Sequence, residues 1–342
     1  MKTKFGDSIK NPFLKFFFLA LILGVTIGYF LGYLTTNTPK THIVQEVKSK
    51  PNYSEIRAGG YQFTNPLLDC DNFNSSLQKN YVDLQNKLKD YINSVLNNGT
   101  ANHVSVYFRS LNDGPWIGIN ENDNYSPASL LKVPILIAVL KKAESNNAVL
   151  KKKILYNKTI EDNVSPNIVD KKSIILGNSY TVDELLEYMI IHSDNNAKAL
   201  LLGLIGDEFL TSVMLDLGVN LKTRDLTIDF ISVKEYSSFY RILYNSSYLS
   251  RQMSEKALEI LSRTEFKKGI PDKLPKNIKI SHKFGERGFA DSNLKQLHDC
   301  GIVYFSDSPY LLCIMTKGSD FKILATIISD ISGIVYNSVS QK

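Results

Sequence analysis

Strand-like segments lie at both ends of the body of this 342-residue chain, and helical segments fill its middle. Runs rich in β-branched and aromatic residues predict strands at Val104–Phe108, Trp116–Ile119, Ile278–Phe284, Gly301–Phe305 and Tyr310–Thr316. Because helices do not alternate with these strands, the order is not that of a parallel βαβ sheet. We therefore expect an α/β structure of the α+β kind. Its one antiparallel sheet is built from N- and C-terminal segments, flanked by helices, with a helical subdomain between them.

Apolar residues spaced three and four apart predict the helices. They are expected at about Asn74–Asn97, Ser129–Ala143, Thr181–His192, Asp207–Leu217, Val233–Tyr244 and Phe321–Val335. The second is almost wholly apolar, which is typical of a helix buried on all sides. Pro134 lies inside it and has no N–H to donate to Leu130, so this helix is expected to bend or to begin late. Thr181 and Glu184 form the pattern of a capping box at the start of the third.

An uncharged run of 19 residues, Phe16–Leu34, precedes the body. A helix of this length crosses the roughly 30 Å hydrocarbon core of a bilayer. Four lysines come before it, at positions 2, 4, 10 and 15, which places residues 1–15 in the cytoplasm and the rest outside. The alternative, a cleaved signal peptide, has an apolar region of about 7–15 residues and a small-residue cleavage site, and TTNTPKTH offers none. The sequence predicts a single-pass anchor in the cell membrane and an extracytoplasmic body.

Small residues recur every four positions in the predicted anchor, at Ala20, Gly24, Gly28 and Gly32. Such a ridge on one helix face lets two membrane helices approach closely, so a homodimer is one expectation. Residues 35–64 carry Thr, Pro, Lys and Asn without an apolar period and are expected to form an extracytoplasmic linker. The body is then residues 65–342.

Charge and cysteine content narrow the possible functions. The 40 Lys+Arg and 34 Asp+Glu give a net charge of +6 without a long basic block in the body, so no nucleic-acid partner is expected. Three cysteines are too few for a disulfide scaffold. A bond of Cys70 with Cys300 or Cys313 is one alternative, and buried thiols are favoured. His192, His282 and His298 show no metal-ligand spacing, so we expect packing or hydrogen-bonding roles and no metal or cofactor.

The first motif that carries chemistry is Ser129-Leu130-Leu131-Lys132, at the start of the apolar helix. Positions three apart share a helix face, so the lysine amine can reach the serine hydroxyl and, when neutral, accept its proton. A helix N-terminus also favours negative charge developing on the attacked group. The S-x-x-K pattern occurs four times by itself, starting at Ser76, Ser129, Ser292 and Ser319. Only Ser129 opens an apolar helix.

Two further motifs follow in order. Ser193-Asp194-Asn195 comes just past the third helix, where a second hydroxyl can relay a proton and an amide can hold a substrate carbonyl. Lys283-Phe284-Gly285 lies on a predicted strand, where the ammonium can attract a carboxylate and the glycine lets a substrate lie along the strand.

The three motifs in this order resemble those of the penicillin-recognising serine enzymes, and class A β-lactamase-like domains most of all, over residues 74–342. The resemblance implies acyl transfer. Ser129 would attack a β-lactam or a D-Ala-D-Ala peptide, Lys132 would be the base or relay, and Ser193 would protonate the leaving nitrogen. Asn195 would position the substrate, and Lys283 would bind its carboxylate. The oxyanion hole would use the backbone N–H groups of Ser129 and Glu286.

Two departures from the family pattern bear on turnover. Class A enzymes carry a deacylating glutamate on a loop, but between Gly218 and Tyr236 there is no E-x-x-x-N, and Asp225 and Asp229 are the only acids before Glu235. The loop is therefore expected to be shortened, with either aspartate capping or pairing in a turn.

The second departure is Phe284, which stands where the family usually has threonine or serine, so Arg287 is a candidate for the lost hydrogen bond to the carboxylate. The alternative for Arg287 is a solvated strand end. A β-lactamase, a D-Ala-D-Ala carboxypeptidase or related penicillin-binding cell-wall enzyme, and a β-lactam sensor acylated without turnover all remain open.

Overall fold

The computed structural model describes residues 16, 20, 21, 23–28, 55–57, 60–70, 81–112, 114–159, 172–221, 229–289, 292–306 and 308–341. It divides into two units, Met1–Asn52 and Tyr53–Lys342. In the first unit the described residues are helical. Most of the expected linker and the rest of the predicted anchor, residues 29–34 included, lie outside the described residues. The anchor therefore stays a prediction.

A five-stranded antiparallel sheet forms the centre of the second unit, with strand order β4-β3-β11-β10-β9. The strands are β3 (His103–Ser110), β4 (Trp116–Ile119), β9 (Lys279–Gly288), β10 (Lys295–Tyr304) and β11 (Tyr310–Gly318). Two strands from the N-terminal part join three from the C-terminal part, which confirms the sheet expected from the sequence. β10 begins before its predicted start, because its first half carries the polar residues Gln296, His298 and Asp299, all buried.

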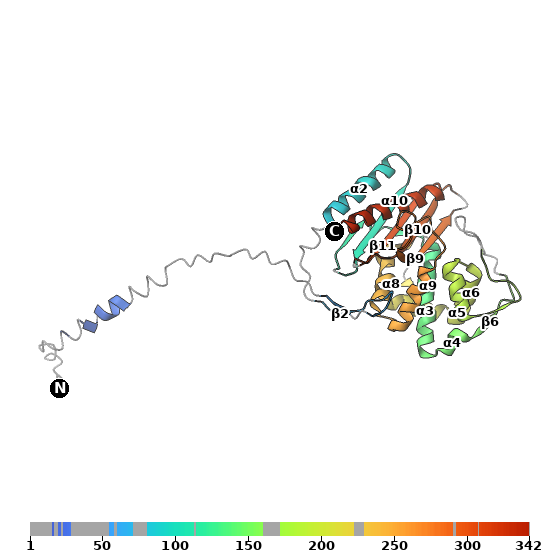
Figure 1. Cartoon of the computed structure of the whole chain (residues 1–342), viewed down its shortest axis with the longest axis horizontal. Helices are drawn as coiled ribbons and strands as arrows, with labels where there is room; N and C mark the ends of the chain where they lie inside the picture. Colours follow the sequence, from blue (N-terminus) through green and yellow to red (C-terminus); the bar gives the residue numbers. More distant parts are fainter. Residues whose placement is uncertain are drawn as a thin grey trace, which may run out of the picture. The chain divides into compact units, whose positions relative to one another are not determined.

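Residues alternate between two hydrophobic cores along the strands. Val104, Val106 and Phe108 of β3 face one core, and Tyr107 faces the other. The first core lies under α2 (Val82–Asn97) and α10 (Phe321–Ser340), which cover one face of the sheet (Figure 1). The second core joins the opposite face to the helical part of the unit.

The helices of this helical part surround α3 (Lys132–Ser145), which is buried along nearly its whole length. They are α4 (Ala148–Lys151), α5 (Val182–Ile191), α6 (Asn195–Ile205), α7 (Asp207–Asp216), α8 (Val233–Asn245) and α9 (Arg251–Ser262). The predicted capping box of Thr181 and Glu184 opens α5, as expected. The sequence analysis missed α6, which follows α5 after a three-residue turn, and α9, which Ser250 caps.

Short strands complete the second unit. They pair as β1 (Glu55–Arg57) with β2 (Leu67–Cys70), β5 (Asn124–Tyr125) with β8 (Ile231–Ser232), and β6 (Lys153–Leu155) with β7 (Ser179–Thr181). The backbone N–H groups of residues 62–64 donate to the Glu255 carboxylate of α9, and Phe63 is buried. The compact unit therefore begins before residue 65, because buried contacts rather than composition set its boundary.

One helix among the described residues is long and apolar enough to cross a membrane, and it is α10. Half of that segment is buried inside the unit, and Leu324, Ile328 and Ile331 pack in the core beneath α2. Its apolar character is that of a core helix.

A disulfide joins Cys300 and Cys313, which lie directly opposite each other on β10 and β11. The expectation of buried thiols, and of Cys70 as the partner in any bond, was therefore wrong. Which cysteines meet depends on strand register, and the sequence pattern did not fix the register of these two strands.

We expect reduction to lower the free energy of unfolding of the second unit by about 2–4 kcal/mol, because the bond closes a loop in the unfolded chain. Urea unfolding with and without dithiothreitol measures the difference, and peptide mapping identifies the bonded pair. Cys70→Ser is the control and should leave the effect of the reductant unchanged. A map that joins Cys70 to either partner would contradict the assignment.

Candidate active site

Ser129 lies in a tight 3-10 turn, η2 (Ala128–Leu131), which leads directly into α3. The predicted late start of the helix is confirmed, since Pro134 is only the third residue of α3. The Leu130 N–H donates to the Pro127 carbonyl at 2.9 Å, and the buried Tyr236 hydroxyl donates to the Leu130 carbonyl at 2.9 Å. These two bonds hold the turn in place.

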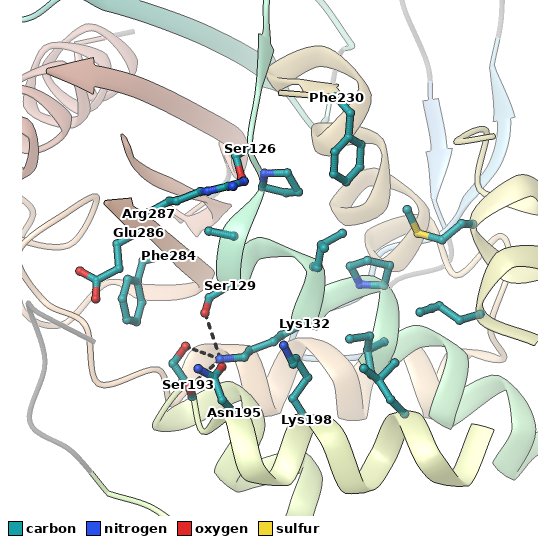
Figure 2. Close-up of a pocket in the computed structure, with 18 of the residues that line it drawn as sticks. Ser126, Ser129, Lys132, Ser193, Asn195, Lys198, Phe230, Phe284, Glu286 and Arg287 are labelled. Carbon is teal, nitrogen blue, oxygen red and sulfur yellow. Dashed lines mark hydrogen bonds between the residues drawn. The ribbon is translucent and has the colours of Figure 1, made fainter. Parts of the chain in front are cut away.

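The turn presents Ser129 to Lys132, whose ammonium lies among three oxygen atoms (Figure 2). It donates to Ser129 Oγ at 3.0 Å, to Ser193 Oγ at 2.9 Å and to the Ser193 carbonyl at 2.5 Å. These bonds use all three N–H groups of a charged lysine. When Lys132 is neutral, it has a lone pair that accepts a proton from one of the two hydroxyls.

Ser193 is held in a strained turn between α5 and α6. Its φ of 56° lies in the left-handed region, and Ala128, next to Ser129, has a φ of 47°. Such residues cost of order 1–3 kcal/mol and persist where the surroundings fix them. Asp194 fixes this turn, because its carboxylate accepts from the Ile174 N–H and from the Asn196 N–H, both at 2.8 Å. Asn195 is the first residue of α6 and lines the same cavity as Ser129.

Lys283 reaches the cluster from β9 and is fully buried. It donates to Ser193 Oγ at 3.0 Å and to the Phe284 carbonyl at 3.1 Å, and its Nζ lies 4.0 Å from the centre of the Phe284 ring. Ser193 Oγ therefore accepts from two lysines. Lys283 is not among the described residues that line the cavity, whereas Phe284 is. Lys283, which was expected to contact a substrate carboxylate, therefore lies against the Phe284 ring and outside the cavity lining.

Phe284 is almost completely buried and stacks on Phe266, with ring centres 4.5 Å apart. Gly285 lies against the catalytic turn, where an added Cβ would come within 2.7 Å of the Pro127 carbonyl oxygen. Glycine is thus required at this position for packing against η2, and its expected contact with a substrate stays a prediction.

Arg287 lines the cavity and donates to Ser126 Oγ at 2.6 Å. It is therefore part of the site and not a solvated strand end. Ser126 is a buried residue that the sequence analysis missed. Its N–H donates to Gln296, and His298 Nε2 lies 3.0 Å from its carbonyl. The sequence signal for Ser126 is a single hydroxyl residue three positions before Ser129, and this pattern is too common to identify a functional residue.

Two of the three histidines make hydrogen bonds, as expected. His282 Nδ1 lies 2.8 Å from the Asp299 carboxylate inside the body, and His298 Nε2 lies 3.0 Å from the Ser126 carbonyl. His192 Nδ1 lies 3.0 Å from the Glu265 carboxylate. Burial lowers the pKa of His298 to about 4, so it is neutral at physiological pH.

No described carboxylate faces Ser129. Asp229 accepts from Gln296 at 2.9 Å and from Lys317 at 2.6 Å, so it pairs at the end of its loop as predicted. Asp225 lies outside the described residues. Glu286 is the one carboxylate among the described residues that line the cavity, and Figure 2 shows it directed away from Ser129 and Lys132.

The cluster depresses the pKa of both of its lysines. Burial lowers the pKa of Lys132 well below its ordinary value, and the charges of Lys283 and Lys198 lower it further against the opposing effect of Asp194 and Glu286. Burial lowers the pKa of Lys283 to about 7. Lys198 was missed from the sequence, although it follows Asn195 by three positions on the same face of α6.

We expect Lys283→Met to stabilise the protein at neutral pH. As the pH falls from the ordinary lysine pKa of 10.5 to about 7, the unfolded chain gains a proton that buried Lys283 does not, so the wild type loses stability over that range. Removing the lysine removes this loss. Set against two lost hydrogen bonds, the net gain at pH 7 is about 1–3 kcal/mol.

Urea unfolding at pH 7 and pH 10 measures this gain, which should shrink towards the higher pH. Lys279→Met, at the exposed start of the same strand, is the matched control and should show no such trend. A Lys283→Met protein that is less stable than the wild type at pH 7 would contradict the argument.

The fold and the cluster together define a class of protein. They place a serine and a lysine of lowered pKa at a helix start, a second serine in a turn between helices, and a lysine on the edge strand of an antiparallel sheet. This is the arrangement of the penicillin-recognising serine enzymes.

Comparison with known proteins identifies the family. The model of the beta-lactamase enzyme family matches residues 86–339, so the chain belongs to this family. Beta-lactamase VEB-1 of Pseudomonas aeruginosa is 22% identical over 260 residues, which cover 70% of this chain and 86% of that protein.

Solved structures share the fold. A β-lactamase from Chitinophaga pinensis has a TM-score of 0.64 at 22% identity, over 74% of this chain and 99% of that one. A mutant of PBP-A, solved as an acyl-enzyme complex with penicillin G, has a TM-score of 0.63 at 22% identity, over 76% of this chain and 98% of that one.

Proposed function

We propose that the protein is a membrane-anchored, extracytoplasmic serine hydrolase of the class A β-lactamase type that forms an acyl-enzyme on Ser129 with a β-lactam or a related amide. The observation that carries this proposal is the hydrogen-bonded set of Ser129, Lys132 and Ser193 beside a cavity of about 790 Å³. A nucleophile, a base and a relay within hydrogen-bond reach are what acyl transfer requires.

The proposed acylation moves one proton around the cluster. Neutral Lys132 takes the proton of Ser129 as Oγ bonds to the carbonyl carbon, and the backbone N–H groups of Ser129 and Glu286 stabilise the oxyanion. The C–N bond then breaks. Ser193 gives its proton to the leaving nitrogen and regains one from Lys132, and Lys283 donates a hydrogen bond to the Ser193 oxygen as the proton leaves.

Substrate contacts follow from what lines the cavity. Asn195 supplies an amide for the substrate carbonyl. Arg287 replaces the shielded Lys283 as the direct partner of a substrate carboxylate, since its planar fork suits that group and Phe284 offers no donor. The charged form of Lys283 then attracts the carboxylate from a distance and does not contact it.

Deacylation is proposed to be slow, because a water molecule on the acyl-enzyme needs a base and no described carboxylate faces Ser129. This observation favours a second candidate function on the same site. A D-Ala-D-Ala carboxypeptidase or other penicillin-binding cell-wall enzyme would use Lys132 in both half-reactions, and a β-lactam would leave it acylated. A sensor would show the same lasting adduct without peptidase activity.

Location of the second unit outside the cytoplasm is supported by the Cys300–Cys313 bond, which suits an oxidising compartment. Membrane anchoring is supported by the uncharged run Phe16–Leu34 and the lysines that precede it. Dimerisation through Gly24, Gly28 and Gly32 remains part of the proposal, and crosslinking in lipid tests it.

The intact mass of the chain, followed after mixing with penicillin G, tests the function. We expect an adduct of the mass of the drug that persists for many minutes, because Ser129, Lys132 and Ser193 are arranged for acylation and none of the described carboxylates faces Ser129. An adduct that disappears quickly while the drug is consumed would instead establish efficient β-lactamase turnover. The absence of any adduct would contradict the proposal that this site accepts β-lactams.

A further inference from the structure

The cavity beside Ser129 has a second part that the proposed chemistry does not use. Its polar part is lined by Ser126, Ser129, Lys132, Ser193, Asn195, Lys198, Glu286 and Arg287. The other part is lined by apolar side chains, and we call it the apolar chamber. Its lining comes from three helices and the ends of one loop, and consists of Leu131, Pro134, Ile135, Leu202, Leu210, Met214, Leu221 and Phe230.

Helical spacing explains why these side chains converge. Leu131 and Ile135 are four residues apart at the start of α3, and Leu210 and Met214 are four residues apart on α7. Leu202 follows Lys198 by four residues on α6, so the wall changes from charged to apolar within one turn. The chamber is therefore built from side chains at the start of α3, on α6 and on α7, together with Leu221 and Phe230 at the ends of a loop.

The leucines of the chamber are only partly buried, although they pack against the main core. Leu131, Leu202, Leu210 and Leu221 each keep part of their surface open. Apolar surface that is open to water inside a concave site favours an apolar ligand, because the ligand removes that surface from water.

The wall that α3 contributes offers little to a polar ligand. The first residues of a helix normally present unpaired N–H groups. At the third position of α3 this donor is absent, because the residue is Pro134. A charged or strongly hydrogen-bonding group would find few partners there.

The chamber lies on the acyl side of the reaction. Figure 2 shows Ser193 and Phe284 on one side of Ser129 and Phe230 on the other. Ser193 protonates the leaving nitrogen in the proposed mechanism, so the leaving group extends towards Ser193 and Phe284. The group on the acyl carbon then extends past Leu131 into the chamber, which is continuous with Ser129.

We propose that the apolar chamber is the binding site for an aliphatic acyl group of the substrate. This inference rests on the proposed acyl transfer at Ser129. The natural substrate is thus an amide, lactam or ester with a hydrocarbon chain of several carbons on its acyl side, and the chamber selects for that chain.

The test compares penicillins that share one nucleus and differ only in the 6-acylamino chain, acetyl against hexanoyl. The full chain in phospholipid nanodiscs is mixed with each, and the rate of acylation is followed by intact mass. A fully buried methylene is worth about a fourfold gain in rate. Four partly buried methylenes should therefore make the hexanoyl compound react about tenfold faster or more.

Two variants of α7 assign the effect to the chamber. Leu210→Gln puts an amide into the chamber and should reduce the hexanoyl-to-acetyl ratio to about 1–3. Leu215→Gln changes a side chain on the same helix that is 55% exposed and lies outside the cavity lining, and it should keep the wild-type ratio. A wild-type ratio near one, or an equal fall in both variants, would overturn the proposal.

A second measurement separates this inference from the proposed function. If no penicillin acylates the protein, β-lactam acylation fails as a function, and the chamber is tested by the binding of hexanoate and acetate, observed by NMR against empty nanodiscs. Tighter binding of hexanoate to the wild type, lost in Leu210→Gln and kept in Leu215→Gln, supports the chamber. Equal binding of the two acids overturns it.

Discussion

Ser129→Ala is expected to abolish the penicillin adduct, and to lower any hydrolysis by on the order of 10⁶-fold, as the loss of a serine nucleophile does in other serine hydrolases. In the proposed mechanism the Ser129 hydroxyl is the group that bonds to the acyl carbon, and Ser193 serves as the proton relay. The fold should survive, because Lys132 keeps both of its contacts to Ser193 and the turn is held by Pro127 and Tyr236.

Ser292→Ala is the matched control for this result. Ser292 opens the same S-x-x-K pattern with Lys295, but Ser292 lies in the bend before β10 and Lys295 is the first residue of that strand, so the pair is not at a helix start. Its replacement should leave the yield and the lifetime of the adduct unchanged. An adduct that forms on Ser129→Ala would show that another residue is the nucleophile and would overturn the mechanism.

Lys132→Met is expected to slow acylation by about 10²–10⁴-fold, because it removes the base. In the wild type the rate should rise with pH through the pKa of Lys132, since only the neutral amine can take the proton of Ser129. Burial and the neighbouring charges of Lys283 and Lys198 depress that pKa well below 10.5, so the rise falls at lower pH than for an ordinary lysine. In the variant this rise should disappear.

Acylation rates of both proteins between pH 5 and pH 9 measure these effects. Lys142→Met is the control on the same helix, where the ammonium donates to the Leu204 carbonyl and lies outside the cavity lining. It should retain the wild-type profile. A Lys132→Met protein with an unchanged profile would assign the base to another group, and Lys283, with a pKa of about 7, would be the first to examine.

These predictions describe a site whose geometry lowers the stability of the folded protein. Two lysines are buried beside each other, and the residues at Ala128 and Ser193 have left-handed backbone angles. Each feature destabilises the folded state, and each holds a reacting group in place. The expected gain in stability of Lys283→Met, at the expense of the proton relay, is the direct consequence.

Local patterns predicted the elements that carry the motifs. The continuous apolar run after Ser129 gave a buried helix, and the missing N–H of Pro134 gave its late start. Thr181 and Glu184 gave the start of α5, and the positions of the strands gave an antiparallel sheet from both ends of the body. These features depend on residues close together in the chain, so one sequence is enough to predict them.

Long-range register decided the rest. Cys300 meets Cys313 because β10 and β11 pair residue by residue, and no local signal identifies that pairing. Gly285 is needed because β9 lies against the catalytic turn of a distant segment. Phe284 stacks on Phe266 and lines the cavity, whereas Lys283 does not, so Arg287 is the cation of β9 that lines it.

The sequence by itself determined the order of strands and helices and the pairing of Ser129 with Lys132, because spacing of three on a helix start brings those two groups together. Only the tertiary structure decided which groups line the cavity beside them. Burial of Lys283, the pairing of Asp229 with Lys317 and the convergence of α3, α6 and α7 on an apolar chamber all arise from contacts between segments far apart in the chain. Such contacts depend on how distant segments pack against each other, and the periodicity of a single segment does not predict that packing.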